Sequence, residues 1–334
     1  MGIPLSGSVA RAGHSRPTAT KAGNVEILLG IGKSFSRVVA VYLVLLAVTT
    51  AIHFPYHTDV VVSPSVKQSA SKFYAEIYAE PVAARADSNG AEYIQTAQQA
   101  IQHEDVVPRV TRFVEQMGLK DKRVLDVGAG TGYLQDIVPN YVGLDISPTA
   151  KRFFHKPYVE ASATDMPFHN GEFDALWSIW VLEHVPNPEQ ALMEMRRVVK
   201  DGGLLYLLPA WNCIPWAADG YAVRPYSDFG VKGKLIKASL PVLLHPIFVD
   251  AYLLPTRLLR RAYSSMSGAP TRLHYNQITP NFDHYWMPDS DAINSIDSYE
   301  AMLWFTSRGD ECLSCGPHPV LENRELVIRV HKKP

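Results

Sequence analysis

Short apolar runs alternate with amphipathic stretches through the middle of the chain. These runs are rich in Val, Leu and Ile and are bounded by Gly, Asp or Pro, which predicts five β-strands, at residues 123–127, 141–144, 158–160, 174–179 and 203–208. A helix is predicted before the last strand, with Asn187 as N-cap, Pro188 at its first position and Gln190 completing a capping box. Strands alternating with helices predict an α/β fold with a parallel sheet covered on both faces.

A glycine-rich turn follows the first predicted strand. It has the spacing Asp126-x-Gly128-x-Gly130-x-Gly132, and a second acid, Asp145, ends the second strand. Ligands of parallel sheets bind beyond the carboxyl ends of the strands, where glycines let the backbone approach closely. A dinucleotide fingerprint would need a third glycine at Tyr133, so this residue disfavours a nicotinamide cofactor. A helix is predicted to begin in the turn and to cover residues 133–138.

Four segments in this region resemble the successive motifs of class I S-adenosylmethionine-dependent methyltransferases. They are VLDVGAGTGYL, GLDIS, ATDMPF and FDALWSIWVLEHVPNPEQALMEMRRVVKDGGLLYLLPA. The resemblance covers residues 90–210 and is strongest to the small-molecule branch that includes the ubiquinone-biosynthesis methyltransferases. It implies a Rossmann-like seven-stranded sheet closed by an antiparallel hairpin, with S-adenosylmethionine as cofactor. Residues 289–309 resemble methyltransferases encoded among bacterial surface-polysaccharide genes.

The resemblance also implies a set of cofactor-binding residues. The glycine turn would hold the methionyl part, and Asp145 would bind the ribose hydroxyls. Asp165 would receive the adenine amino group between Ile146 and Met166. The full predicted set is Asp126, Gly128, Gly130, Gly132, Asp145, Ile146, Asp165, Met166 and Ser178.

Two histidines are candidates for the general base that transfer to a hydroxyl would use. His184 follows the fourth predicted strand, and His284 lies in a later insertion that can close over the substrate. The alternative for His184 is a capping or packing role beside Val185. No metal site is predicted, because no recognised ligand spacing occurs. Cys312 and Cys315 are interpreted as ordinary thiols.

The first 120 residues precede the predicted sheet. Residues 1–37 are predicted to be a disordered basic leader and residues 38–56 a membrane helix or anchor; a signal peptide and a buried helix are the alternatives. Residues 57–120 are predicted to form helices that pack on the core, the second interrupted at Pro108. The charge bias of the flanks favours a cytoplasmic N-terminus, whereas the cofactor favours a catalytic domain that faces the cytoplasm.

The predicted cofactor-binding core covers residues 121–210, and two further segments are expected after it. Residues 211–290 are predicted to be an insertion or substrate lid, in which an apolar stretch, 240–254, has basic flanks and several prolines. The prolines argue against a straight membrane span, so two short helices on an interface or an apolar lid are expected, with a buried cap as the alternative. Residues 291–334 are predicted to form a helix, 295–308, and the closing hairpin.

Composition narrows the function. With 32 Lys and Arg against 33 Asp and Glu, the net charge of −1 disfavours nucleic acid as a partner. We therefore expect a membrane-associated S-adenosylmethionine-dependent methyltransferase whose acceptor is a small molecule, a lipid or a lipid-linked sugar, methylated on oxygen. The alternatives are an NAD-dependent oxidoreductase and a cofactor-binding scaffold without catalysis.

Overall fold

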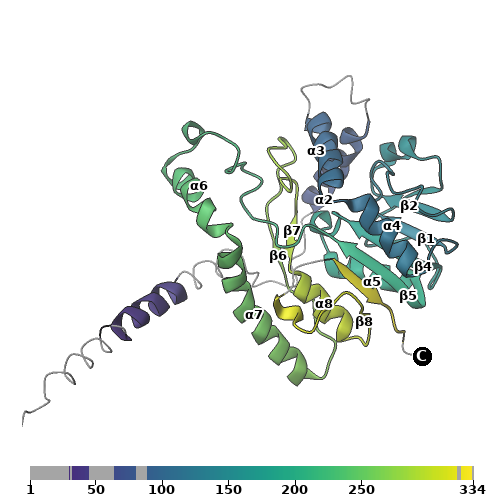
Figure 1. Ribbon diagram of the computed structural model, residues 1–334. Helices are drawn as coiled ribbons and strands as arrows, with labels where there is room; N and C mark the ends of the chain where they lie inside the picture. Colours follow the sequence, from purple (N-terminus) through teal and green to yellow (C-terminus); the bar gives the residue numbers. More distant parts are fainter. Residues whose placement is uncertain (1–29, 31, 45–63, 80–88, 322–324, 333–334) are drawn as a thin grey trace, which may run out of the picture. The chain divides into compact units, whose positions relative to one another are not determined.

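A mostly parallel sheet of seven strands organises the described part of the chain, which in this computed structural model comprises residues 30, 32–44, 64–79, 89–321 and 325–332 (Figure 1). The strand order is β3-β2-β1-β4-β5-β9-β8. Neighbours from β3 to β5 are parallel, and β9 is antiparallel to both β5 and β8. The strands are β1 (Val124–Val127), β2 (Tyr141–Asp145), β3 (Tyr158–Glu160), β4 (Phe173–Ile179), β5 (Val199–Leu208), β8 (Glu311–Cys312) and β9 (Leu326–Arg329). The predicted strands and closing hairpin are confirmed.

Helices cover both faces of this sheet. On one face, α4 (Val106–Gln116) packs Val110 and Phe113 against inward-facing residues of β1, β4 and β5. On the other face, α5 (Pro188–Val198) and α8 (Ser298–Thr306) cover Leu125, Leu176 and Leu205. Strands buried on both faces explain why the apolar runs are continuous and do not alternate.

The predicted cap of α5 is present. The side chain of Asn187 accepts a hydrogen bond from the backbone N–H of Gln190 at 3.1 Å, and Pro188 occupies the first helical position. The helix ends at Val198 and the chain enters β5 at once, so Gly202 lies within that strand.

Two predicted helical features differ from the structure. Residues 133–138 form turns and bends in place of a helix. Only eight residues separate Gly132 from β2, and Pro139 is among them, so too few remain for a helix that crosses back along the sheet. The second predicted helix of the N-terminal region breaks at Glu104–Asp105, between α3 (Asn89–His103) and α4, and Pro108 lies in the first turn of α4, where proline is tolerated.

The residues between β5 and α8 form the insertion. It contains α6 (Val231–Leu243), α7 (Pro246–Ser267) and a small antiparallel pair, β6 (Tyr275–Gln277) and β7 (Asn294–Ile296). The helix predicted from residue 295 therefore begins later, as α8. The interpretation of Cys312 and Cys315 as free thiols is wrong, because the two form a disulfide.

The chain divides into two units, Met1–Thr50 and Ala51–Pro334. In the first unit, residues 32–44 are helical, which corrects the prediction of disorder for residues 32–37. Apart from Gly30, the rest of the predicted leader and of the 38–56 run lies outside the described residues. No single described helix has both the length and the apolar character needed to cross a membrane; α6 and α7 meet that requirement only together, with a bend of 87° between them.

Candidate cofactor and acceptor site

A cavity of about 340 Å³ opens beyond the carboxyl ends of β1, β2 and β4. This is where a parallel sheet binds its ligands, and the volume falls in the range of about 300–1,000 Å³ that is typical of ligand pockets. The cavity has four of the predicted site residues in its wall, namely Gly128, Asp145, Ile146 and His184. Further wall residues come from α2 (Pro64–Ile77), from α3, from the segment after β3 and from the segment after β4.

The glycine turn is held open by backbone geometry that favours glycine. Gly128, Gly130 and Gly132 have φ angles of 76°, 52° and 71°. A Cβ at Gly128 would overlap the Val181 side chain, and a Cβ at Gly130 would lie 3.2 Å from the Tyr78 hydroxyl. The turn can therefore approach a ligand closely only with these residues.

Asp145 connects the turn to the cavity. Its carboxylate accepts the backbone N–H groups of Gly130 and Ser147, both at 2.9 Å. Burial raises the pKa of Asp145, and these backbone hydrogen bonds oppose the rise. The next residue, Ile146, is 41% exposed and lines the same cavity. A carboxylate beside an exposed apolar side chain fits a ribose next to an adenine ring.

Asp126 lies behind the turn and outside the cavity wall. It is buried, and its carboxylate accepts the Tyr141 hydroxyl at 2.8 Å. Burial raises the pKa of Asp126 to about 7, although the hydrogen bond from Tyr141 acts in the opposite direction. Asp126 therefore lies in β1 just before the turn, accepts a hydrogen bond from Tyr141 and does not line the cavity.

This burial predicts a pH dependence of folding stability. The folded pKa of Asp126 is about 7 and exceeds the unfolded value, so the folded state binds the extra proton and loses stability as pH rises toward 7. Between about pH 5 and pH 8, we expect the ionisation of Asp126 to lower the free energy of unfolding of the wild type by on the order of 2–3 kcal/mol. Asp126→Asn should not show this decrease. Urea unfolding of both proteins at the two pH values measures this, and identical pH profiles would contradict it.

The remaining predicted residues lie outside the cavity wall. Gly132 packs under Phe154, since a Cβ there would lie 2.9 Å from its ring. Asp165 is exposed, and its neighbour Thr164 lines the cavity in its place. Two further predicted residues, Met166 and Ser178, are buried. The second candidate base, His284, is exposed, and the centroid of its ring lies 3.7 Å from that of Trp286. The candidate bases are therefore not brought together, and only His184 reaches the cavity.

His184 is fixed by a short helix and by the end of the insertion. The 3₁₀ helix η3 (Leu182–His184) follows β4, and Asn294 donates to the carbonyls of Leu182 and Val185 at 2.9 and 2.7 Å. The N–H of Ile293 donates to the carbonyl of Glu183 at 2.9 Å. These three bonds attach the insertion to the backbone that carries the histidine.

Three carboxylates surround His184. The Nδ1 atom lies 3.3 Å from Asp291 Oδ2, and Nε2 lies 3.8 Å from Glu183 Oε1. Burial by itself lowers the pKa of His184, but the negative charges, first that of Asp291 and then that of Glu183, outweigh this effect and raise it. Burial raises the pKa of Glu183 to about 7. The histidine is thus placed to accept and hold a proton.

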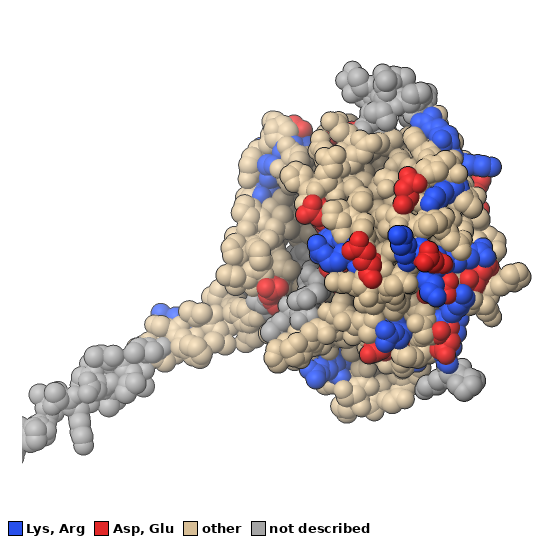
Figure 2. All heavy atoms as spheres, turned by 45° about the vertical axis from the view of Figure 1, so that its right-hand side comes forward, with Lys and Arg blue, Asp and Glu red and all other residues tan. Residues whose placement is uncertain are grey.

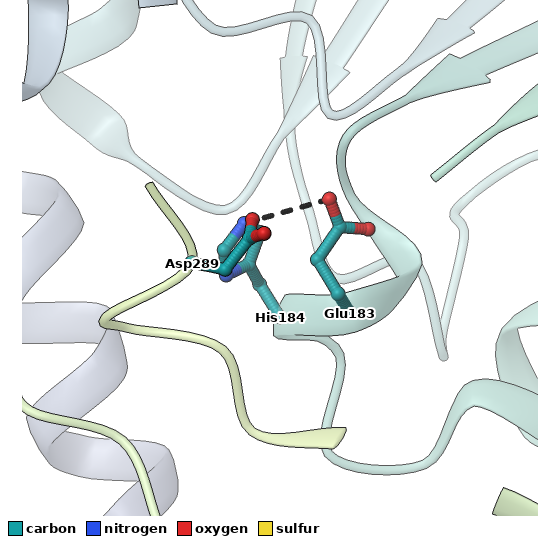
Figure 3. A group of neighbouring side chains, drawn as sticks. All are labelled: Glu183, His184 and Asp289. Atoms are coloured by element: carbon teal, nitrogen blue, oxygen red, sulfur yellow. Dashed lines mark ion pairs between the residues drawn. The ribbon is translucent and has the colours of Figure 1, made fainter. Parts of the chain in front are cut away.

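Figure 3 shows how Asp289 approaches this pair. Glu183 and His184 project from η3, and Asp289 comes from the insertion loop beside the imidazole. Donor atoms of these three residues lie within 4.8 Å of one another, so among the described residues this group has the geometry to hold a metal ion. Sequence spacing did not indicate it, because Asp289 follows His184 by about a hundred residues.

Several wall residues were not predicted. Tyr74, Tyr78 and Tyr93 come from the N-terminal helical region, which was predicted only to pack on the core. Tyr74 donates its hydroxyl to Asp291 Oδ2 at 2.7 Å, and burial, then the charge of Asp291, raise the pKa of Tyr74 well above its usual value. Tyr74 therefore stays protonated and holds Asp291 against His184.

Residues 125–207 match the family model described as a methyltransferase domain. A ubiquinone biosynthesis O-methyltransferase of Dechloromonas aromatica is 36% identical over 121 residues, which cover 31% of this chain and 51% of that protein. An uncharacterised protein of Methanocaldococcus jannaschii is 42% identical over 100 residues, 28% of this chain and 40% of its own length.

Residues 125–207 are a class I methyltransferase domain. The cofactor of this domain is S-adenosylmethionine, and the glycine turn, Asp145 and Ile146 have the geometry to hold it. The chain spans about half the length of the curated relatives that it matches. A solved putative methyltransferase of Bacillus halodurans is 27% identical, covering 29% of this chain and 49% of that chain, with a TM-score of 0.27.

Proposed function

We propose that this protein transfers a methyl group from S-adenosylmethionine to a hydroxyl oxygen of a small, largely apolar acceptor. The observation that supports this proposal most strongly is the position of His184. It lies in the wall of the cavity that begins at the glycine turn, and the carboxylate of Asp291 lies behind it. A base at this place suits an acceptor that must lose a proton as it is methylated.

The cofactor-binding part of the proposal assigns roles to the turn and β2. The backbone of the Gly128–Gly132 turn would contact the methionyl part, Asp145 would accept hydrogen bonds from the ribose, and Ile146 would pack on the adenine. When bound, S-adenosylmethionine supplies an electrophilic methyl group on a sulfonium, which is a good leaving group. The protein then has to align the acceptor and exclude water.

His184 would take the acceptor proton as the new C–O bond forms and the S–C bond breaks. The resulting imidazolium would be stabilised by Asp291, whose carboxylate is held by the Tyr74 hydroxyl. This arrangement fixes the ring orientation and stabilises the charge that develops on it. Transfer to a nitrogen that is already unprotonated would need none of these groups.

Aromatic residues favour an apolar acceptor. Tyr74, Tyr78, Tyr93 and Trp180 contribute to the wall together with Val181. Trp180 has a φ of 53°, which is uncommon for a large side chain and occurs where β4 ends at the cavity. Rings that line a cavity exclude water and pack against planar or aliphatic groups.

We also propose that the protein is membrane-associated, with the methyltransferase domain facing the cytoplasm and with lipids or lipid-linked sugars among its acceptors. Support comes from the uncharged run at residues 38–52 and from the need of the domain for S-adenosylmethionine.

Labelled methyl transfer tests the activity. The purified full chain is incubated with S-adenosylmethionine that carries a labelled methyl group and with fractionated membrane lipids or water-soluble metabolites. We expect label in the product of an apolar acceptor whose hydroxyl group has become a methyl ether. Label found only on amines, or transfer equal to that of heat-inactivated protein, would contradict the proposal.

A further inference from the structure

The insertion helices α6 and α7 carry long apolar stripes on their exposed sides. On α6 the stripe comprises Val231, Leu235, Ala238 and Val242 at helical spacing. On α7 it comprises Leu258, Leu259, Ala262, Tyr263 and Met266. The large side chains of the α7 stripe range in exposure from 49% at Leu258 to 86% at Met266. Contiguous exposed apolar surface of this kind marks an interaction site.

The opposite side of α7 is fixed to the core, so its exposed stripe has a defined direction. Arg257 is buried and donates to both carboxylate oxygens of Asp297 at 2.8 and 2.5 Å. One turn later, Arg260 donates to both oxygens of Glu300 at 2.7 and 2.9 Å. Two bidentate ion pairs therefore hold one face of α7 on the N-terminal region of α8. Rotation that would bury the apolar stripe would break both pairs.

Charge distinguishes this surface from an ordinary hydrophobic patch. Between Val231 and Ser267 the sequence has six Lys and Arg residues and one acidic residue, Asp250. Lys232, Lys234 and Arg261 are exposed beside the two stripes. In the view of Figure 2, acidic and basic residues are interspersed over the right-hand side. Apolar residues flanked by cations are typical of helices that lie in the headgroup region of a bilayer.

We propose that α6 and α7 dock on the surface of a lipid bilayer that carries anionic headgroups. The axes of α6 and α7 are bent by 87° at the break between the two helices, so together they define a plane. A flat bilayer surface can contact both, whereas a groove on a protein accommodates a single helix. Leu258, Leu259 and Met266 would enter the boundary between headgroups and acyl chains, and Lys232, Lys234 and Arg261 would contact lipid phosphates. The inference rests on the proposed membrane association but not on the chemistry of methyl transfer.

A dye placed on α7 tests the contact locally, separately from membrane binding by other segments. The full chain with Leu259→Cys is labelled with an environment-sensitive fluorophore, which is selective because Cys213 is buried and Cys312 and Cys315 are paired. Phosphatidylcholine vesicles with and without phosphatidylglycerol are added. We expect a blue shift that is quenched by brominated acyl chains and is stronger with the anionic vesicles. The matched control, Met193→Cys at an exposed position of α5, should show neither effect.

A second variant measures the contribution of the stripe. Leu258→Ser combined with Leu259→Ser and Met266→Ser changes only outward side chains, so the folded state should persist, as judged by circular dichroism. We expect vesicle affinity to fall by at least about tenfold. If the full chain binds vesicles while the dye at position 259 does not respond, membrane association stands and this inference is overturned. A dye response without lipid that grows with protein concentration would also overturn it, in favour of a second copy of the chain.

Discussion

Replacing His184 with glutamine is expected to lower kcat by about 10²–10³-fold while the Kd for S-adenosylmethionine changes by less than about twofold. Glutamine keeps much of the side-chain volume but cannot accept and hold the acceptor proton. The loss should therefore appear in the chemical step and not in cofactor affinity. Single-turnover methyl transfer and calorimetric titration of the cofactor measure the two quantities separately.

His284→Gln is the matched control for this experiment. His284 is exposed, lies outside the cavity wall and was the other base predicted from sequence, so its replacement should change kcat by less than about twofold. Both assays are run with a chelator present, because Glu183 and Asp289 could also hold a cation next to His184. Wild-type activity that disappears in the chelator, or equal losses in the two variants, would contradict the role of His184 as base.

Asp145→Ala is expected to weaken binding of S-adenosylmethionine by roughly 10–100-fold, because hydrogen bonds to a charged group contribute about 1.5–3 kcal/mol. The substitution removes the carboxylate from the cavity wall and also removes the acceptor for the N–H groups of Gly130 and Ser147. The glycine turn should then lose its fixed position. Calorimetric titration with S-adenosylmethionine and with S-adenosylhomocysteine measures the loss.

Glu160→Ala provides the comparison for Asp145→Ala. Glu160 is paired with Asp145 in the sheet register and ends the neighbouring strand, but its side chain is exposed and does not line the cavity. Its replacement should leave cofactor affinity within about twofold of wild type. Similar affinity losses in both variants would mean that general charge at this edge of the sheet, and not a specific contact of Asp145, controls binding.

Local chemistry made much of the sheet predictable. Each core strand is a short apolar run, and the capped start of α5 is specified by Asn187 and Pro188 alone. The glycine turn was predicted for a similar reason, since positive φ angles at alternate positions favour glycine whatever surrounds them. The prediction of a helix at 133–138 was wrong because the local sequence pattern does not indicate how short the connection between β1 and β2 is.

The surroundings of His184 were less predictable because they depend on long-range contacts. Asp289 and Asp291 lie beside His184 because Ile293 and Asn294 attach the insertion to the backbone of η3, and nothing near position 184 indicates those partners. Tyr74 belongs to the helices that were predicted only to pack on the core, because an aromatic at helical spacing has the same pattern whether it packs in a core or lines a cavity. His284 matched His184 in residue type, but the fold leaves it exposed.

Titration calorimetry of the full chain with S-adenosylhomocysteine and with NAD⁺ tests most directly the claim that the glycine turn and Asp145 form an adenosylmethionine site. We predict saturable binding of S-adenosylhomocysteine, lost when Gly130→Val places a side chain against the Tyr78 hydroxyl, and no binding of NAD⁺. Binding of NAD⁺ in preference, or affinity for S-adenosylhomocysteine that Gly130→Val leaves unchanged in a folded protein, would contradict it.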